Sequence, residues 1–177
     1  MKIGELAKLA AGTAPGSITL KDRKDWKLMG KKEMYVPYNT YELTYQKDPS
    51  KLTKPNFLAP DLVRWEKHRV WVVEGSLKAG ARHVYKSRRF YLDEDSWVAL
   101  ASDEYDARGQ LYRGSFAFLT QSYDKSIPDA TPHMIYDLVS GSYNVNGLVG
   151  PHGGIKYIEP LSKNQWSPDS LAGAGIR

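Results

Sequence analysis

Four strand-like segments follow one another in the middle of the chain, and the short turns between them constrain the fold more than any other feature. The segments are rich in β-branched and aromatic residues and cover residues 64–77, 82–92, 97–105 and 110–123. Four residues of turn-forming composition separate each segment from the next, at positions 78–81, 93–96 and 106–109. Connectors of this length and composition are typical of β-hairpins, so the sequence predicts an antiparallel sheet built in hairpin order.

Two further regions extend this predicted sheet. From residue 32 onward Met34, Val36 and Tyr38 recur at every second position, as they would along a strand. Pro37 cannot donate a ladder hydrogen bond, which predicts an edge or bulged position for that strand. Residues 134–149 contain another predicted strand pair. The expected fold class is therefore mainly β, an antiparallel meander with few short helices.

Composition divides the chain into two parts. Residues 1–31 form a basic segment in which Ile3, Leu6 and Ala10 occur at helical spacing, so a short N-terminal helix is expected there. Residues 32–177 are expected to form the β domain, which ends in a tail rich in Gly and Pro. The longest strictly apolar run has five residues, 97–101, which is too short for a membrane helix. The N-terminal segment also lacks the apolar run of a secretory signal.

Both faces of the predicted sheet are apolar. Tight turns would place five aromatic side chains on one face: Trp71, Phe90, Trp97, Phe116 and Phe118. The opposite face collects valine and leucine side chains from the same strands. An antiparallel sheet normally keeps one face polar and solvated. The second apolar face therefore needs a cover, which can be a partner chain, a further segment of chain or a bound ligand.

Residue patterns that would support catalysis or metal binding have simpler explanations. Asp93, Glu94 and Asp95 could supply paired carboxylates, but they lie in a predicted tight turn, where aspartate bonds its own backbone. His68 and His83 share a face of neighbouring strands yet lie near opposite ends of the predicted hairpin. The sequence has no cysteine and no Gly-x-Ser-x-Gly motif. We therefore expect a non-enzymatic protein with no metal ion and no cofactor.

Basic residues gather along one stretch but have acidic neighbours. Residues 61–90 are rich in Lys and Arg, whereas residues 91–110 contain six acidic residues and one arginine, and adjacent strands would bring the two stretches together. Ion pairing is expected within one group: Arg69, Arg89, Glu66 and Glu74. Arg88 is expected to lie opposite Trp71 as a cation–π pair. Because much of the positive charge is neutralised in this way, we expect no nucleic-acid partner.

Several blocks of the sequence resemble one known family and occur in that family's order. They cover residues 33–39, 64–74, 80–97, 103–113 and 136–143. Pro168, Leu171 and Arg177 match the family's closing pattern. From about residue 31 onward the chain resembles the C-terminal half of the DUF1329 family, whose members are often labelled outer-membrane lipoprotein-sorting proteins. We expect this chain to lack the N-terminal half and the signal peptide of that family.

The resemblance implies a periplasmic protein with a curved antiparallel sheet, a half-barrel like that of periplasmic lipoprotein carriers. Such half-barrels hold a lipophilic molecule on the concave face under helices. Family members often accompany RND-type exporters and outer-membrane proteins, which are therefore the implied protein partners. No catalytic motif is established for the family.

Two functional hypotheses follow from the sequence and the resemblance. The first is non-enzymatic binding or carriage of a lipophilic molecule, such as an acyl chain or a lipid, in the cell envelope. Its expected ligand contacts are the five aromatic residues of the shared face. The second is a structural or interaction domain whose second apolar face is covered by a partner chain or by the missing N-terminal half. An open sheet with an unpaired edge also predicts self-association into a homo-oligomer.

Overall fold

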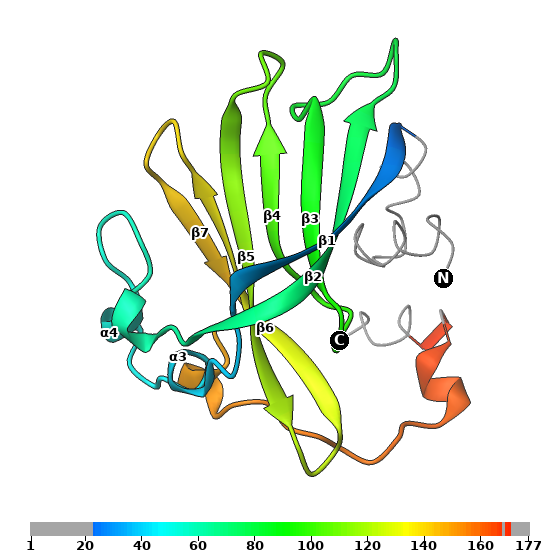
Figure 1. Ribbon diagram of the computed structural model, residues 1–177. Coiled ribbons are helices and arrows are strands. Elements are labelled where there is room, and N and C mark those ends of the chain that lie inside the picture. The colour runs from blue at the N-terminus through cyan, green and yellow to red at the C-terminus, as the bar shows by residue number, and fades with distance from the viewer. Residues whose placement is uncertain (1–22, 168, 171–177) are drawn as a thin grey trace.

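Seven strands form one antiparallel sheet in the computed structural model, which describes residues 23–167, 169 and 170 (Figure 1). The strands are β1 (Lys24–Pro37), β2 (Trp65–Leu77), β3 (Ser87–Asp93), β4 (Ala99–Tyr105), β5 (Leu111–Ser122), β6 (Ile127–Asp137) and β7 (Tyr143–Asn146). Their order in the sheet is their order in the chain, so each strand pairs with its neighbours in sequence. The predicted antiparallel meander is confirmed.

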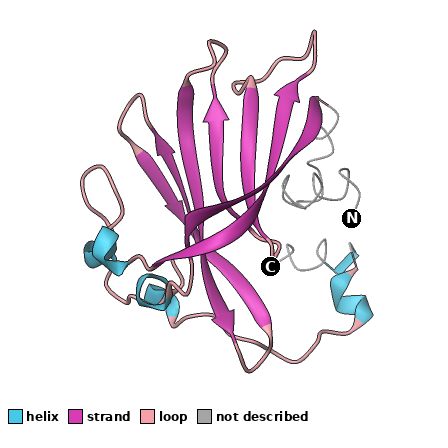
Figure 2. Ribbon diagram, in the orientation of Figure 1, coloured by secondary structure: helices cyan, strands magenta, loops and turns pink. Residues whose placement is uncertain are grey.

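The helices of the described part are short and lie outside the sheet (Figure 2). They are α3 (Tyr41–Thr44), α4 (Pro49–Leu52) and three 3-10 turns, η1 (Pro60–Leu62), η2 (Gly150–His152) and η3 (Lys163–Trp166). The start of α4 is specified locally, because the Asp48 side chain accepts a hydrogen bond from the backbone N–H of Ser50 and Pro49 occupies the first turn. None of the helices in the described residues has the length and apolar content needed to cross a membrane.

The first strand is longer than predicted, since β1 begins at Lys24 and not near residue 32. Its early part pairs with the end of β2, where the Trp26 ring packs directly over Gly75 and fills the space that a Cβ would need. A bulge between Leu28 and Gly30 interrupts the pairing, and Gly30 has a φ of 113° there. β1 forms an edge of the sheet, as Pro37 predicted. The helix expected within residues 1–31 falls outside the described residues.

The sheet is strongly curved, so that β1 and β2 fold back over β4 and β5 (Figure 1). Just beyond β1, the backbone N–H of Thr40 donates to the backbone oxygen of Leu119 in β5, at 2.9 Å. We call the side enclosed by this fold the inner face. Its centre is a buried cluster of eight residues: Val36, Tyr38, Val70, Val72, Tyr91, Leu100, Ala101 and Leu119. β1 and β7 do not pair, so the sheet remains open, and the predicted half-barrel is confirmed.

A second cluster covers the rest of the inner face. The segment that contains α3 and α4 packs Leu43, Leu52 and Leu58 against Phe118 of β5 and Met134 of β6, and all five are buried. The chain therefore supplies its own cover for the inner face, from the helical segment between β1 and β2.

The opposite side, which we call the outer face, is also apolar. Val73, Phe90 and Leu92 form its buried cluster, with Trp71 and Trp97 packed against them. The rings of Trp71 and Trp97 stack with their centroids 6.4 Å apart. The prediction of two apolar faces is confirmed.

The strand register differs from the tight-turn prediction and divides the five predicted aromatic residues between the two faces. β2 ends at Leu77 and β3 begins only at Ser87, so their connection is longer than a four-residue turn and Trp71 lies opposite Leu92. Between β3 and β4 the register shifts at a bulge between Tyr91 and Leu92, so Phe90 lies opposite Ser102 and not Ala99, an odd displacement that exchanges the faces of the residues that follow the bulge in β4 and β5. The expected single face is therefore wrong. Trp71, Phe90 and Trp97 lie on the outer face, whereas Phe116 and Phe118 lie on the inner face.

Candidate functional site

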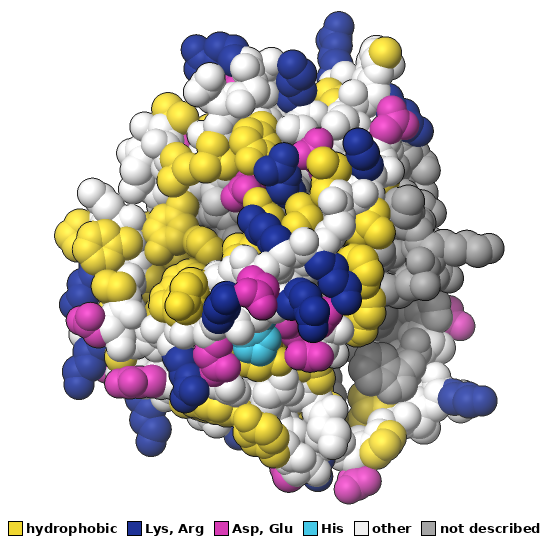
Figure 3. All heavy atoms as spheres, in the orientation of Figure 1, with side chains coloured by type: hydrophobic (Ala, Val, Ile, Leu, Met, Phe, Trp, Pro, Cys, Tyr) yellow, Lys and Arg dark blue, Asp and Glu magenta, His cyan; other side chains and the backbone are white. Residues whose placement is uncertain are grey.

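A pocket of about 250 Å³ lies between the inner face and the chain segment that follows α4. We call it the apolar pocket. Its lining residues are Phe57, Leu58, Pro60, Val63, Trp65, Phe116, Phe118 and Tyr136. None of these side chains is charged, and the only side-chain polar groups among them are one phenol and one indole N–H. In the space-filling view, hydrophobic side chains gather on the left of the molecule, where this segment meets the sheet (Figure 3).

Hydrogen bonds tie the segment over the pocket to the sheet. The backbone N–H of Leu58 donates to the hydroxyl of Tyr136, at 3.3 Å, and the hydroxyl of Tyr143 donates to the backbone oxygen of Lys54, at 2.7 Å. The segment is closed on itself by the backbone N–H of Ala59, which donates to the oxygen of Leu52. These bonds fix the position of residues 54–59, so the pocket exists as a feature of the fold.

The pocket has a buried floor and an exposed aromatic rim. Phe118 at the floor is 2% exposed, whereas Phe57 and Trp65 at the rim are 48% and 43% exposed. The ring of Trp65 meets that of Phe116 edge to face, with centroids 5.5 Å apart. Burial raises the pKa of the Tyr136 phenol, so this hydroxyl stays protonated at neutral pH. An apolar ligand entering here would cover the two rim side chains while leaving the floor unchanged.

Of the five predicted ligand-binding residues, the apolar pocket contains two. Phe116 and Phe118 line it, whereas Trp71, Phe90 and Trp97 lie on the other side of the sheet. Their role in ligand binding stays a prediction. Neither Phe57 nor Trp65 was predicted as a pocket residue, because Phe57 lies in a polar, proline-rich loop between predicted strands and Trp65 was assigned only to the strand of residues 64–77. The apolar pair at 57 and 58 inside that polar loop was the signal that could have indicated a packing segment.

A second pocket, of about 190 Å³, opens on the outer face and is lined by Arg88, Phe90, Ser115 and His133 among others. Its charged group is already paired. Arg88 donates through Nη2 and Nε to Oε1 of the buried Glu104, at 2.7 and 3.1 Å. Ser102 also donates to this oxygen, at 2.7 Å. Because the guanidinium is engaged with its carboxylate, this pocket offers a ligand fewer unused polar groups than its lining suggests.

The charge pairing expected between strands is present, with different partners in part. Arg89 and Glu74 form the expected pair, at 2.6 Å, whereas Arg69 pairs with Glu94, at 2.7 Å. The expected contact of Arg88 with Trp71 is wrong, because the shifted register places Arg88 opposite Gly75. Lys31 occupies the position over the Trp71 ring instead, 4.2 Å from its centroid. Figure 3 shows acidic and basic side chains interspersed across the middle of this view.

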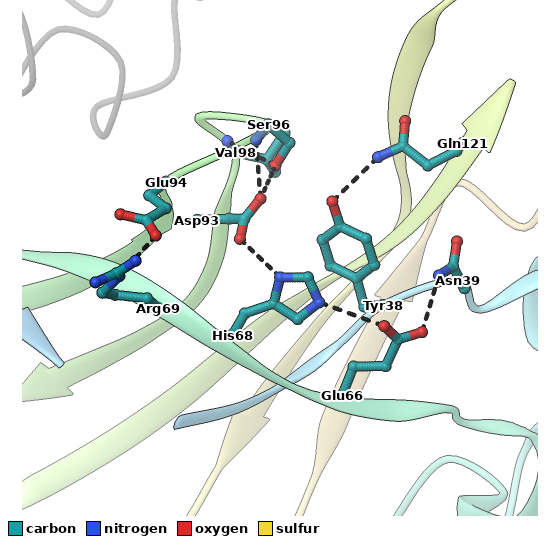
Figure 4. A network of polar contacts seen from close by, with 10 residues as sticks. All are labelled: Tyr38, Asn39, Glu66, His68, Arg69, Asp93, Glu94, Ser96, Val98 and Gln121. Atoms are coloured by element: carbon teal, nitrogen blue, oxygen red, sulfur yellow. Dashed lines mark hydrogen bonds and ion pairs between the residues drawn. The ribbon is translucent and has the colours of Figure 1, made fainter. Parts of the chain in front are cut away.

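A network of polar side chains lies at the open end of the β2–β3 hairpin, beside the turn that follows β3 (Figure 4). Nδ1 of His68 lies 3.2 Å from Oδ1 of Asp93, and Nε2 lies 3.4 Å from Oε2 of Glu66. The ring of Tyr38 stacks on the imidazole with a centroid distance of 3.9 Å. His68, Asp93 and Asp95 could hold a metal ion, since their ligand atoms lie within 4.8 Å of one another. From the sequence alone these residues were expected in a turn and a strand, with no contact between them.

Comparison with known proteins places this fold in a family. The sequence pattern of the family described as "Protein of unknown function (DUF1329)" matches residues 19–172. The chain belongs to the DUF1329 family. A relative from Pseudomonas aeruginosa, described as uncharacterized, is 42% identical over 158 residues. This match covers 88% of the present chain and 35% of the relative, so the chain spans about a third of the length of that protein.

Two solved structures resemble this DUF1329 chain at low sequence identity. One is a DUF1329 family protein from Desulfovibrio piger, with a TM-score of 0.45, 17% identity, and coverage of 85% of this chain and 48% of that one. The other is a candidate outer membrane lipoprotein-sorting protein domain from Vibrio parahaemolyticus, with a TM-score of 0.45, 12% identity, and coverage of 93% and 58%.

Proposed function

We propose that this DUF1329 chain binds a lipophilic molecule, without catalysis, in the apolar pocket. The observation that carries the proposal is the lining, in which eight residues present aromatic and aliphatic surface and no charge. A small number of polar groups in a mostly apolar concavity favours binding of an apolar ligand over chemistry on it. An acyl chain or an aromatic ring fits this lining better than a charged metabolite does.

The volume of the pocket sets the size of the group it takes. An apolar cavity of about 150 Å³ is enough to bind benzene in a protein core. The apolar pocket has about 250 Å³ and opens at a rim of exposed aromatic side chains. It therefore suits one ring system or part of an acyl chain, with the remainder of a longer ligand lying across Phe57 and Trp65. Covering these two side chains contributes roughly 25 cal/mol for each Å² of apolar surface removed from water.

The cell envelope is the proposed location, and envelope exporters or outer-membrane proteins are the proposed partners. The support is the block-by-block resemblance to a family whose members accompany such systems. Carriage requires that the ligand can leave, and a pocket with an exposed rim allows this more readily than a closed cavity.

The alternative function is a structural or interaction domain. It is favoured by the outer face, where Trp71 and Trp97 pack in an apolar cluster on the side of the sheet away from the helical segment. The present chain also spans only 35% of its Pseudomonas aeruginosa relative, so further chain in such a protein could cover this face. In that case purified protein would associate through the sheet and would yield no ligand on extraction.

Ligand uptake through the rim can be measured with the fluorescent probe N-phenyl-1-naphthylamine. We expect the chain to bind the probe, and Phe57→Ala to weaken binding about tenfold, which corresponds to about 1.4 kcal/mol. Tyr35→Ala is the matched control, because Tyr35 is an aromatic residue of β1 that is 66% exposed and does not line the pocket.

Two outcomes would contradict the proposal. One is equal probe affinity in the wild type, Phe57→Ala and Tyr35→Ala, which would place the probe elsewhere. The other is a dimer in sedimentation together with an organic extract that contains no fatty acid or phospholipid by mass spectrometry. That pair of results would support the interaction domain.

A further inference from the structure

The geometry at the open end of the β2–β3 hairpin, beside the turn that follows β3, points to a metal site that is independent of the apolar pocket. We propose that His68, Asp93 and Asp95 bind a divalent transition-metal ion such as Zn²⁺. One imidazole nitrogen and two carboxylate oxygens, the donor types that Zn²⁺ accepts, lie within 4.8 Å of one another. The structure assigns His68 and the two aspartates as ligands, and Glu66 as the residue that orients the imidazole.

The strongest sign of a missing ligand is a buried oxygen with no hydrogen bond. The Asp93 side chain is 0% exposed, and its Oδ1 has no hydrogen-bond partner among the described residues. It lies 3.2 Å from Nδ1 of His68, but the contact does not have hydrogen-bond geometry. Buried carboxylate oxygens are costly unless they are hydrogen-bonded, paired with a charge or bound to a metal. A cation between Oδ1 and Nδ1 would satisfy both atoms.

The turn that follows β3 holds Asp93 in this orientation. Oδ2 of Asp93 accepts from the backbone N–H and the hydroxyl of Ser96, at 2.8 and 2.7 Å (Figure 4). The backbone of Asp93 pairs with Val98 and Trp97 on the other side of the turn. With Oδ2 and the backbone engaged, Oδ1 is left directed at the imidazole. This arrangement requires no rearrangement of the buried ligand before a metal binds.

The imidazole of His68 is held on its other side. Nε2 lies 3.4 Å from Oε2 of Glu66, while Oε1 of that carboxylate accepts from Asn39 at 2.8 Å and pairs with Arg64 at 2.8 Å. Tyr38 stacks on the ring (Figure 4). A metal-bound histidine commonly donates its second N–H to a carboxylate, which fixes the ring and its tautomer. Glu66 occupies the position for that role, so Nδ1 is the nitrogen that would face the metal.

The spacing of the donors matches the proposed ion. With metal–ligand bonds of about 2.0–2.1 Å, two ligands of a tetrahedral ion lie roughly 3.3 Å apart. Nδ1 of His68 and Oδ1 of Asp93 are already separated by 3.2 Å. Asp95 is exposed and makes no hydrogen bond or ion pair with another described residue, so its side chain can turn inward to complete three protein ligands. The fourth position would remain for water or an external ligand.

Charge and donor type select the class of cation. Two carboxylates balance the charge of one divalent ion, and the neutral imidazole leaves that balance unchanged. Ca²⁺ and Mg²⁺ prefer sites made of oxygen, with six or more ligands for Ca²⁺ and octahedral geometry for Mg²⁺. An imidazole together with carboxylates suits zinc or a neighbouring first-row metal. We therefore expect Zn²⁺ to bind and Ca²⁺ and Mg²⁺ to bind far more weakly.

The test uses the full chain, prepared without a histidine tag and treated with EDTA, and titrates it with Zn²⁺ by isothermal calorimetry. We expect one Zn²⁺ per chain. Asp95→Asn should weaken binding at least about tenfold, and His68→Gln should weaken it further, because each removes a direct ligand. Asp106→Asn is the matched control, since Asp106 also bonds turn backbone, at the β4–β5 hairpin, but is not part of the cluster.

Folding of the variants is checked separately, so that a loss of Zn²⁺ binding can be attributed to the missing ligand and not to unfolding. Asp95→Asn changes an exposed side chain and should melt at the wild-type temperature without metal. Absorption spectra of the Co²⁺-loaded chain should show tetrahedral coordination in the wild type and a changed spectrum in His68→Gln. Absence of stoichiometric Zn²⁺ binding would overturn the proposal. So would Zn²⁺ affinity unchanged in Asp95→Asn and His68→Gln, which would place the ion at His83, His133 or His152.

Discussion

Replacing Phe118 with alanine distinguishes the floor of the apolar pocket from its rim. Phe118 is 2% exposed and packs in one cluster with Leu43, Leu52, Leu58 and Met134. Truncating such a ring removes its burial and leaves a cavity, which costs about 3–5 kcal/mol. That is a large share of the total stability of a domain, which is about 5–15 kcal/mol.

The expected signal is a clear loss of thermal stability. In a domain of this size each 1 kcal/mol lowers the melting temperature by about 2–4 °C, so Phe118→Ala should melt about 6–20 °C below the wild type. Far-ultraviolet circular dichroism of delipidated protein is the assay, because a bound ligand would itself raise the melting temperature.

Phe57→Ala is the internal comparison, since Phe57 lines the same pocket but is 48% exposed. Its loss should cost less than about 1 kcal/mol, because about half of the ring surface already faces water. The stability effect should therefore belong to the floor and the effect on probe binding to the rim. A melting temperature for Phe118→Ala within about 2 °C of the wild type would refute the reasoning, because the loss of a buried ring should lower the unfolding free energy by more than that.

Two further predictions concern buried charges. Burial, and then the charge of Arg88, lower the pKa of Lys24 from 10.5 to about 8, with Glu104 opposing. Between pH 8 and 10.5 the unfolded chain therefore binds more protons than the folded chain, so Lys24 makes the unfolding free energy rise with pH across that window. Urea titrations at several pH values should show this rise in the wild type, and Lys24→Met should remove it. Glu104→Gln should cost about 3 kcal/mol in the same assay, because it leaves Arg88 without its carboxylate. Glu33→Gln, which breaks an exposed pair with Lys67, should lower the unfolding free energy far less than Glu104→Gln does, because water screens the exposed pair; equal losses would contradict the role of burial.

The amino-acid sequence by itself determined the strands and their order. Alternating apolar residues and short runs of Gly, Asp and Ser act over a few positions, so 97–105 and 110–123 could be predicted as a hairpin and observed as β4 and β5. Pro37 predicted an edge strand for the same local reason, since a missing N–H is a property of one residue. The presence of apolar side chains on both faces also followed from composition within the strands.

The tertiary structure decided which residues share a face and which meet at a site. Strand register depends on connection length and bulges, and an odd displacement between β3 and β4 moved Phe116 and Phe118 to the inner face. The longer β2–β3 connection pairs Val70 with Asp93, which brings His68 to the turn after β3. The apolar pocket forms because a proline-rich segment folds over distant strands. These contacts join residues far apart in sequence, and their free energy depends on long-range packing, which a local sequence pattern does not specify.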